Sequence, residues 1–243
     1  MKLAVINGNE RHGSTWNIMD TVRKALDRYG DVETTEFYLP KDMPHFCRGC
    51  FSCFMHGEQT CPHAASVQPI VTAMLGADVI VLTSPVYGLD VSGQMKALLD
   101  HLCYMWVSHR PNPRMFSKIG LTITTTAGAG LKHTSKTMRD SLNYWGVLRV
   151  LSLAMPVSAM KWSDVQNKKR AHIEKKAERI AKRIAGYVRR AGHMRQRVFF
   201  RIFFALMQRM MRHNDWSPYD RKHWENQGWV GPTPSITDPE GKA

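Results

Sequence analysis

The sequence predicts an α/β fold, a doubly wound parallel sheet of five strands with helices on both faces. Two observations lead to this prediction. Short apolar runs alternate with amphipathic stretches between residues 2 and 156, which is the pattern of strand–helix–strand units. The run at residues 78–84 is typical of a strand that a parallel sheet buries on both faces. Hydrophobic residues make up 43% of the 243, which is enough to build a core.

Each element follows from its own pattern. The expected strands are residues 2–7, 32–38, 78–84, 118–126 and 147–156. The expected helices are residues 15–29, 66–77, 92–107 and 132–145. Right-handed crossovers between such strands give a parallel sheet, and the common order for five strands is 2-1-3-4-5. Ligands of this architecture bind beyond the carboxyl ends of the strands, so the loops after residues 7, 84 and 126 are the expected site.

The chain changes character near residue 160. Residues 1–160 carry 15 Lys and Arg against 12 Asp and Glu, a net +3, whereas residues 161–243 carry 19 against 8, a net +11. We expect a ligand-binding domain over 1–160 and a basic extension over 161–243. The extension begins with a core helix at 164–192 that packs on the sheet, continues with an apolar-aromatic helix at 196–212, and ends in an irregular arm.

Targeting signals are not visible in the sequence. The first residues form a strand pattern instead of an apolar signal segment, and no run of about 18 apolar residues is present. We therefore expect a cytoplasmic protein.

The first loop, residues 7–15, has the composition of a phosphate-binding turn. It supplies two glycines for tight turns, two hydroxyl groups and one positive charge, namely Gly8, Gly13, Ser14, Thr15 and Arg11. The helix that follows offers free N–H groups and a positive dipole end. The loop matches neither the Walker A nor the GxGxxG pattern, which favours a terminal phosphate. The alternative is an ordinary strand–helix turn with a Ser or Thr cap.

The second loop, residues 83–89, is suited to a flat ring. Pro85 stiffens it, Gly88 permits close approach, and Tyr87 can lie against an aromatic ligand. The alternative is a rigid strand–helix connection with a surface tyrosine.

Taken together, three loops resemble the NADPH-dependent FMN reductase family, which has a flavodoxin-like fold. The matching segments are NGNERHGST at 7–15, TSPVYGLDVSGQMKALLD at 83–100 and TTAGAG at 125–130, and the resemblance covers about residues 1–160. It implies that FMN lies at the sheet edge. The phosphate would be held by the first loop, through Asn9, Arg11, Gly13, Ser14 and Thr15. The isoalloxazine ring would lie between the second loop (Pro85, Val86, Tyr87 and Gly88) and the third (Thr126, Ala127 and Gly128).

The resemblance also implies a reaction. An FMN-dependent oxidoreductase of this family accepts electrons from NAD(P)H and passes them to a small acceptor such as a quinone or a nitro compound. The flavin carries the chemistry, so we assign no catalytic side chain. The sequence does not distinguish NADH from NADPH, because it has no dinucleotide fingerprint.

Four of the five cysteines lie within fifteen residues, in the pattern Cys47-x2-Cys50-x2-Cys53-x7-Cys61. In a chain expected in the cytoplasm, such clustering favours metal or redox chemistry over disulfides. The spacing resembles that of the iron–sulfur flavoproteins, a branch of the same superfamily, and implies a [4Fe–4S] cluster on these four residues and an electron-transfer role. Zinc, joined by His45, His56 or His63, and free thiols stay open as alternatives. The fifth cysteine, Cys103, is expected in the core.

The segment 198–211 (VFFRIFFALMQRMM) is basic and aromatic, and it is too short to span a bilayer. We expect it to form part of a homodimer or higher homo-oligomer, joined through the C-terminal arm. Contact with an anionic membrane surface is the less favoured alternative. No nucleic-acid partner is expected, because the apolar spacing is that of a helix and not of aromatics interleaved on a basic sheet.

Overall fold

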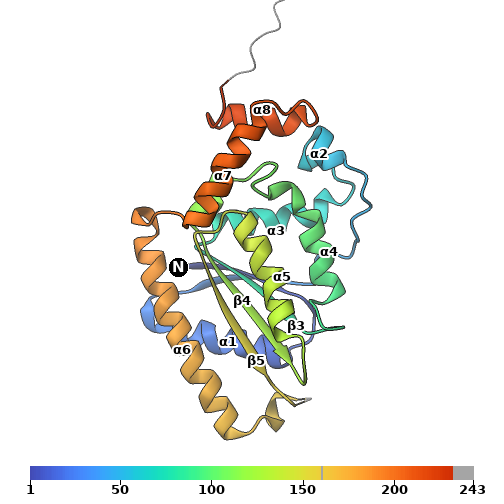
Figure 1. Ribbon diagram of the computed structural model, residues 1–243. Coiled ribbons are helices and arrows are strands. Elements are labelled where there is room, and N and C mark those ends of the chain that lie inside the picture. Colours follow the sequence, from blue (N-terminus) through green and yellow to red (C-terminus); the bar gives the residue numbers. More distant parts are fainter. Residues whose placement is uncertain (160, 232–243) are drawn as a thin grey trace, which may run out of the picture.

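The computed structural model describes residues 1–159 and 161–231 of the chain, and Figure 1 shows its arrangement. The strands are β1 (Lys2–Asn7), β2 (Glu33–Tyr38), β3 (Val79–Pro85), β4 (Ile119–Thr126) and β5 (Arg149–Pro156). The helices are α1 (Ser14–Leu26), α2 (Ser52–His56), α3 (Ala64–Gly76), α4 (Gly93–His101), α5 (Leu131–Tyr144), α6 (Asn167–Arg190), α7 (Val198–Met211) and α8 (Pro218–Asn226).

The five strands form one parallel sheet in the order β2-β1-β3-β4-β5. The predicted doubly wound, flavodoxin-like sheet with order 2-1-3-4-5 is therefore confirmed. The central strand β3 is buried along almost its whole length, as its apolar sequence predicts.

Alternate residues of the strands face two separate cores. On one face, Ile6, Ile80 and Leu82 pack against apolar side chains of α3, α4 and α5. On the other face, the neighbouring residues Val5 and Val81 pack against α1 and α6. This alternation follows from the two-residue period of a strand, and it covers both faces of the sheet with helices.

The helix predicted over residues 92–107 is shorter in the structure, because α4 ends at His101. Leu102 leaves the helical conformation and residues 103–105 form a 3₁₀ turn. The N–H of Val107 then donates to the carbonyl of Tyr144 at 2.8 Å, at the end of α5. Apolar residues continue past His101 because tertiary contacts bury this segment as well. The apolar pattern of residues 92–107 therefore does not reveal where the helix ends and the 3₁₀ turn begins.

The extension packs on the sheet and on itself. Helix α6 lies against α1 and β5 through its apolar face, which includes Ile173, Ala177 and Ile184. Helices α7 and α8 enclose a second apolar cluster, in which Trp224 is fully buried. None of the described helices is both long enough and apolar enough to cross a bilayer.

The expectation of an irregular arm after residue 213 misses α8. Ser217 caps this helix by accepting a hydrogen bond from the N–H of Asp220, and Pro218 occupies the first turn. Ser followed by Pro is a recognised start signal, and burial of Trp224 stabilises the helix against the rest of the chain. Residues 232–243 of the arm lie outside the described residues.

Candidate functional site

The three predicted loops meet at one edge of the sheet. In the parallel register Asn7 pairs with Thr83, and Pro85 pairs with Thr125, so the carboxyl ends of β1, β3 and β4 lie side by side. The loops at 8–13, 86–92 and 127–130 leave the sheet at this edge. The structure therefore brings the residues of the three motifs together.

Direct hydrogen bonds fix the loops to one another. The hydroxyl groups of Thr15 and Thr125 are 2.7 Å apart and buried. The N–H of Gly8 donates to the carbonyl of Thr83 at 2.7 Å, and the hydroxyl of Ser92 donates to the carbonyl of Gly8 at 2.6 Å. A Cβ atom on Gly8 would lie 2.8 Å from both of these neighbours, so only glycine fits this crossing.

The N-terminus of α1 is open to a ligand. Its N-cap is Gly13, and among the described residues no side chain caps the first turn. The backbone N–H groups of that turn are thus available to an anion, which the helix dipole also favours. Arg11 is exposed and Ser14 half-buried beside this turn, whereas the hydroxyl of Thr15 is already shared with Thr125.

The second loop is a tight hairpin. The backbone groups of Tyr87 and Asp90 bond to each other in both directions, at 2.8 and 3.0 Å. Gly88 and Leu89 between them have φ of 55° and 69°, the conformation of a type I′ turn. The turn leaves the ring of Tyr87 49% exposed, and its hydroxyl accepts a hydrogen bond from the side chain of Asn9 at 3.3 Å. A flat, accessible aromatic surface therefore stands beside the first loop.

The third loop closes through Thr126. Its hydroxyl donates to the carbonyl of Ala129 at 2.8 Å and accepts from the N–H of Gly128 at 3.1 Å. Ala127 and Gly128 are exposed, and a Cβ atom on Gly128 would have no neighbour within 4 Å in the part of the chain that the structure describes. Gly130 is different, since a Cβ atom there would lie 2.6 Å from Val86 in the second loop.

Sequence reasoning overlooked several residues that hold this site in shape. Ser84 accepts from the N–H of Ser92, and Asp90 accepts from both the N–H of Val91 and the hydroxyl of Thr137. Hydroxyl residues at the ends of strands are the sequence signal that could have indicated such contacts between loops. The resulting edge, with an uncapped helix N-terminus, an exposed ring and close-packed glycines, fits a ligand that joins a phosphate to a flat aromatic system.

The four clustered cysteines line one cavity of about 60 Å³. Gly49 and Phe51 have positive φ angles of 63° and 58°, so the chain turns sharply between Cys47 and the short helix α2, which carries Cys53. Burial raises the pKa of the Cys53 thiol to about 11, with a further contribution from Cys61. Four thiols around one cavity are the donor set of an iron–sulfur cluster, and also of structural zinc.

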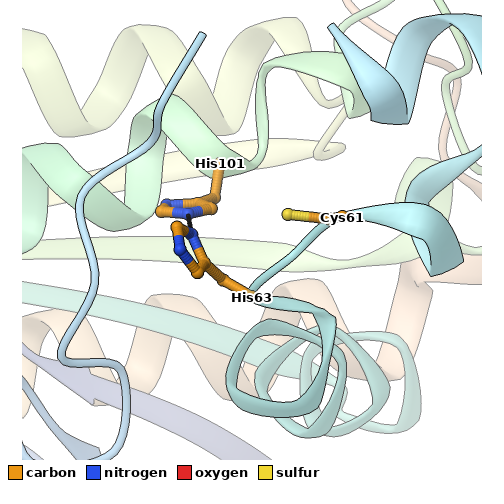
Figure 2. A group of neighbouring side chains, drawn as sticks. All are labelled: Cys61, His63 and His101. Carbon is orange, nitrogen blue, oxygen red and sulfur yellow. Dashed lines mark hydrogen bonds between the residues drawn. The ribbon is translucent and has the colours of Figure 1, made fainter. Parts of the chain in front are cut away.

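Two histidines lie beside Cys61, as Figure 2 shows. The Nδ1 atom of His63 is 2.8 Å from Nε2 of His101. One ring nitrogen of each histidine and the sulfur of Cys61 all lie within 4.8 Å of one another. Burial, together with neighbouring His101, lowers the pKa of His63, which favours the neutral, metal-ligating form. His45 stacks on His63 with ring centroids 4.5 Å apart. His101 was not expected from the sequence.

The C-terminal helix α8 is tied to the cysteine segment. The buried guanidinium of Arg110 bonds to the buried carboxylate of Asp220 and to the carbonyl of Cys53. It also lies over the ring of Tyr219, 4.9 Å from the ring centroid. Residues far apart in sequence thereby hold one wall of the cysteine cavity.

Comparison with known proteins agrees with this architecture. A family model described as NADPH-dependent FMN reductase matches residues 1–160. The chain is 29% identical over 152 residues to an iron–sulfur flavoprotein of Archaeoglobus fulgidus, covering 62% of this chain and 66% of that one. It is 35% identical over 102 residues to an iron–sulfur flavoprotein of Methanocaldococcus jannaschii, covering 41% and 51%. The matches thus span about half to two thirds of the length of these relatives.

Solved structures with low sequence identity share the fold. An azoreductase from Bacillus anthracis superposes with a TM-score of 0.60 at 12% identity, covering 75% of this chain and 99% of that one. An NADH:FMN oxidoreductase in its apo form gives a TM-score of 0.54 at 18% identity, covering 74% and 88%. With the family match over residues 1–160, these findings show that the chain belongs to the NADPH-dependent FMN reductase family.

Proposed function

We propose that this protein binds FMN at the meeting point of the three loops and acts as an oxidoreductase, taking electrons from NAD(P)H and passing them to a quinone, a nitro compound or a similar acceptor. The observation that carries the proposal is the uncapped N-terminus of α1 beside the exposed ring of Tyr87. One end of this site suits a phosphate and the other a flat ring. We also propose that residues 1–160 form the FMN-binding domain and 161–243 its extension.

The first loop would hold the phosphate of FMN. The N–H groups that follow Gly13 point out of the start of α1, where Ser14 is the first helical residue and the side chain of Arg11 lies beside Gly13. Asn9, in the same loop, donates to the hydroxyl of Tyr87. A charge-assisted hydrogen bond from Arg11 would add to the helix dipole. Thr15 would take part mainly by fixing the loop, because its hydroxyl is bonded to Thr125.

The second and third loops would hold the isoalloxazine ring. Pro85, Val86, Tyr87 and Gly88 form one wall, and Thr126, Ala127 and Gly128 form the other. The flavin, when bound, supplies the capacity to accept and donate electrons. The protein contributes orientation, since the hairpin at 87–90 and the turn at 126–129 are each closed by their own hydrogen bonds.

A second candidate function is electron transfer through a [4Fe–4S] cluster on Cys47, Cys50, Cys53 and Cys61. The specific observation that favours it is that all four thiols line one cavity. Relatives named iron–sulfur flavoproteins add support. Zinc is the competing metal, favoured by the position of His63 and His101 beside Cys61.

One preparation tests these alternatives together. Protein purified without oxygen is analysed for flavin, iron, acid-labile sulfide and zinc, and its visible spectrum is recorded before and after dithionite. We expect one FMN per chain in every case. Iron and sulfide in about equal amounts, about four of each per chain, support the cluster, whereas zinc without sulfide supports the alternative metal. Colourless protein that fails to bind added FMN contradicts the proposed function.

A homo-oligomer joined through the C-terminal arm stays a prediction. Part of the aromatic side of the arm is turned inward, since Trp224 is fully buried and its indole N–H donates to the carbonyl of His109 at 2.6 Å, whereas Trp216 is exposed. Sedimentation velocity over a tenfold range of protein concentration measures the oligomeric state.

A further inference from the structure

Helix α7 has two apolar faces, and only one is used by the described residues of the chain. Phe200, Met207 and Met211 are buried in the cluster with α8. On the adjoining side, about 100° around the helix axis, Phe199, Ile202, Leu206 and Met210 are 61%, 66%, 51% and 57% exposed. They follow at intervals of three and four residues, so they form one continuous stripe along the helix. An exposed apolar stripe of this size marks an interaction surface.

The surroundings of the stripe are strongly basic. Residues 179–214 contain ten Lys and Arg and no Asp or Glu. Arg201 and Arg212 are exposed and lie eleven residues apart, about three helical turns, so both border the stripe on one side. Arg209 is exposed between apolar residues of the stripe.

A second basic feature precedes α7. The C-terminal part of α6 has an open hollow of about 420 Å³, lined by Lys182, Arg183, Arg189 and Arg190 with Gly186 and Tyr187. Residues 191–197 join this part of α6 to α7, whose place in the fold is seen in Figure 1. Anionic groups are thus attracted to the end of α6, which the chain joins directly to the start of α7.

We propose that the outer face of α7 docks on the surface of an anionic lipid bilayer. The apolar stripe would enter the boundary between headgroups and acyl chains, and the arginines would contact lipid phosphates. With 14 residues, α7 is about 21 Å long, which suits a helix that lies in the interface and not one that crosses it. This docking is independent of the flavin and of the cysteine cavity.

Charge distinguishes a membrane from a second copy of the chain. A symmetric dimer through this stripe would place arginine-bordered faces against each other, with no acidic side chain between residues 179 and 214 to pair with them. An anionic bilayer supplies the complementary charge. The structure therefore favours the bilayer as the occupant of this face.

The test is flotation of the full-length protein with vesicles of phosphatidylcholine alone or with 30% phosphatidylglycerol, at low and at high salt. Wild type should float only with the anionic vesicles, and less at high salt. In the variant Ile202→Ser/Leu206→Ser the bound fraction should fall at least tenfold, while Tyr29→Ser, which changes an exposed ring elsewhere, leaves it unchanged. Circular dichroism verifies that each variant is folded.

A second variant tests the charges. Arg201→Gln/Arg209→Gln/Arg212→Gln should weaken binding to anionic vesicles at least tenfold, whereas Lys41→Gln/Arg114→Gln/Lys168→Gln removes the same charge from exposed positions on other elements with a smaller effect. No flotation at low salt overturns the proposal. It is also overturned if Ile202→Ser/Leu206→Ser binds vesicles like wild type, because binding would then be unspecific adsorption. A third contradicting result is that wild type is a dimer that binds no vesicles and that this variant is a monomer.

Discussion

Arg110 and Asp220, 110 residues apart in sequence, form an ion pair in which both side chains are buried. The second nitrogen of the guanidinium reaches the carbonyl of Cys53, and His109 adds a hydrogen bond to the same carboxylate at 2.9 Å. The pair therefore joins α8 to the segment that carries the cysteines.

Asp220→Asn should destabilise the protein by about 3 kcal/mol, because removing one partner of a buried pair leaves the other charge without compensation. Urea unfolding followed by tryptophan fluorescence measures the free energy of unfolding. Glu178→Gln is the matched control: it removes the exposed pair with Arg28, and should cost less than about 1 kcal/mol. Equal losses in the two variants would show that burial of the Arg110 pair does not govern its contribution.

Arg11→Gln should weaken FMN binding about tenfold or more, because a charge-assisted hydrogen bond contributes about 1.5–3 kcal/mol and 1.4 kcal/mol is a factor of ten. The dissociation constants of FMN and riboflavin are measured by flavin fluorescence. Riboflavin has no phosphate, so its affinity should not change. An equal loss of affinity for FMN and riboflavin would mean that Arg11 acts near the ring or in folding and does not bind the phosphate. Arg114→Gln, at an exposed position, controls for the change in net charge.

Gly8→Ala should lower FMN affinity at least tenfold and reduce stability, since the new methyl group would lie 2.8 Å from the carbonyl of Thr83 and from the hydroxyl of Ser92. The backbone contact cannot move away without separating β1 from β3. The control is Gly76→Ala at the end of α3, where a Cβ atom meets no atom of the described residues within 4 Å. FMN affinity is measured by flavin titration and stability by thermal melting for both variants. Equal affinities and equal melting temperatures would refute the role of the close contact at Gly8.

Tyr38 provides a test with pH. Its hydroxyl donates to Glu36 at 2.5 Å and accepts from Trp16 at 3.1 Å. Burial, and then the bond to Glu36, raises the pKa of Tyr38 from 10.0 to about 12. A raised pKa means that the folded state favours the protonated phenol, so this stabilisation is complete below pH 10 and is lost as the pH rises to 12.

In Tyr38→Phe the free energy of unfolding should be lower than in wild type below pH 10, and the difference should shrink between pH 10 and 12. Urea unfolding at several pH values measures it. The exposed Tyr29→Phe should show no such convergence. A difference that stays constant through this range would contradict the assigned hydrogen bond.

The sheet could be predicted from the sequence because its signals are local. Each strand is a short apolar run bounded by polar loops, and the strand order follows from general topology. The end of α4 at His101 depends on tertiary burial, which a periodic pattern does not contain. Helix α8 is missed although Ser217 and Pro218 signal its start, because the burial of Trp224 that stabilises it comes from the rest of the fold. Local sequence therefore predicts the sheet better than it predicts the ends of helices or a short helix such as α8.

The candidate site, like the fold, could be predicted only in part from the sequence. Loop composition predicts the positions of Arg11, Tyr87 and Gly128 at one sheet edge. It does not predict that Thr15 and Thr125 bond to each other, since they lie 110 residues apart. Likewise, cysteine spacing predicts that the four thiols act together as a ligand set, whereas His101 comes to Cys61 only through the packing of α4 against the start of α3.

The position of His101 gives the last prediction. If the cavity holds a [4Fe–4S] cluster, Cys61→Ser should abolish or strongly reduce iron and sulfide content, and His101→Gln should retain both, because the four thiols complete the ligand set. If it holds zinc through Cys61, His63 and His101, His101→Gln should lose the metal as Cys61→Ser does. Cys103→Ser is the matched control, since Cys103 lies outside the cavity lining and its thiol bonds to the carbonyl of Leu99. Loss of metal in Cys103→Ser, with retention in Cys61→Ser, would contradict both assignments.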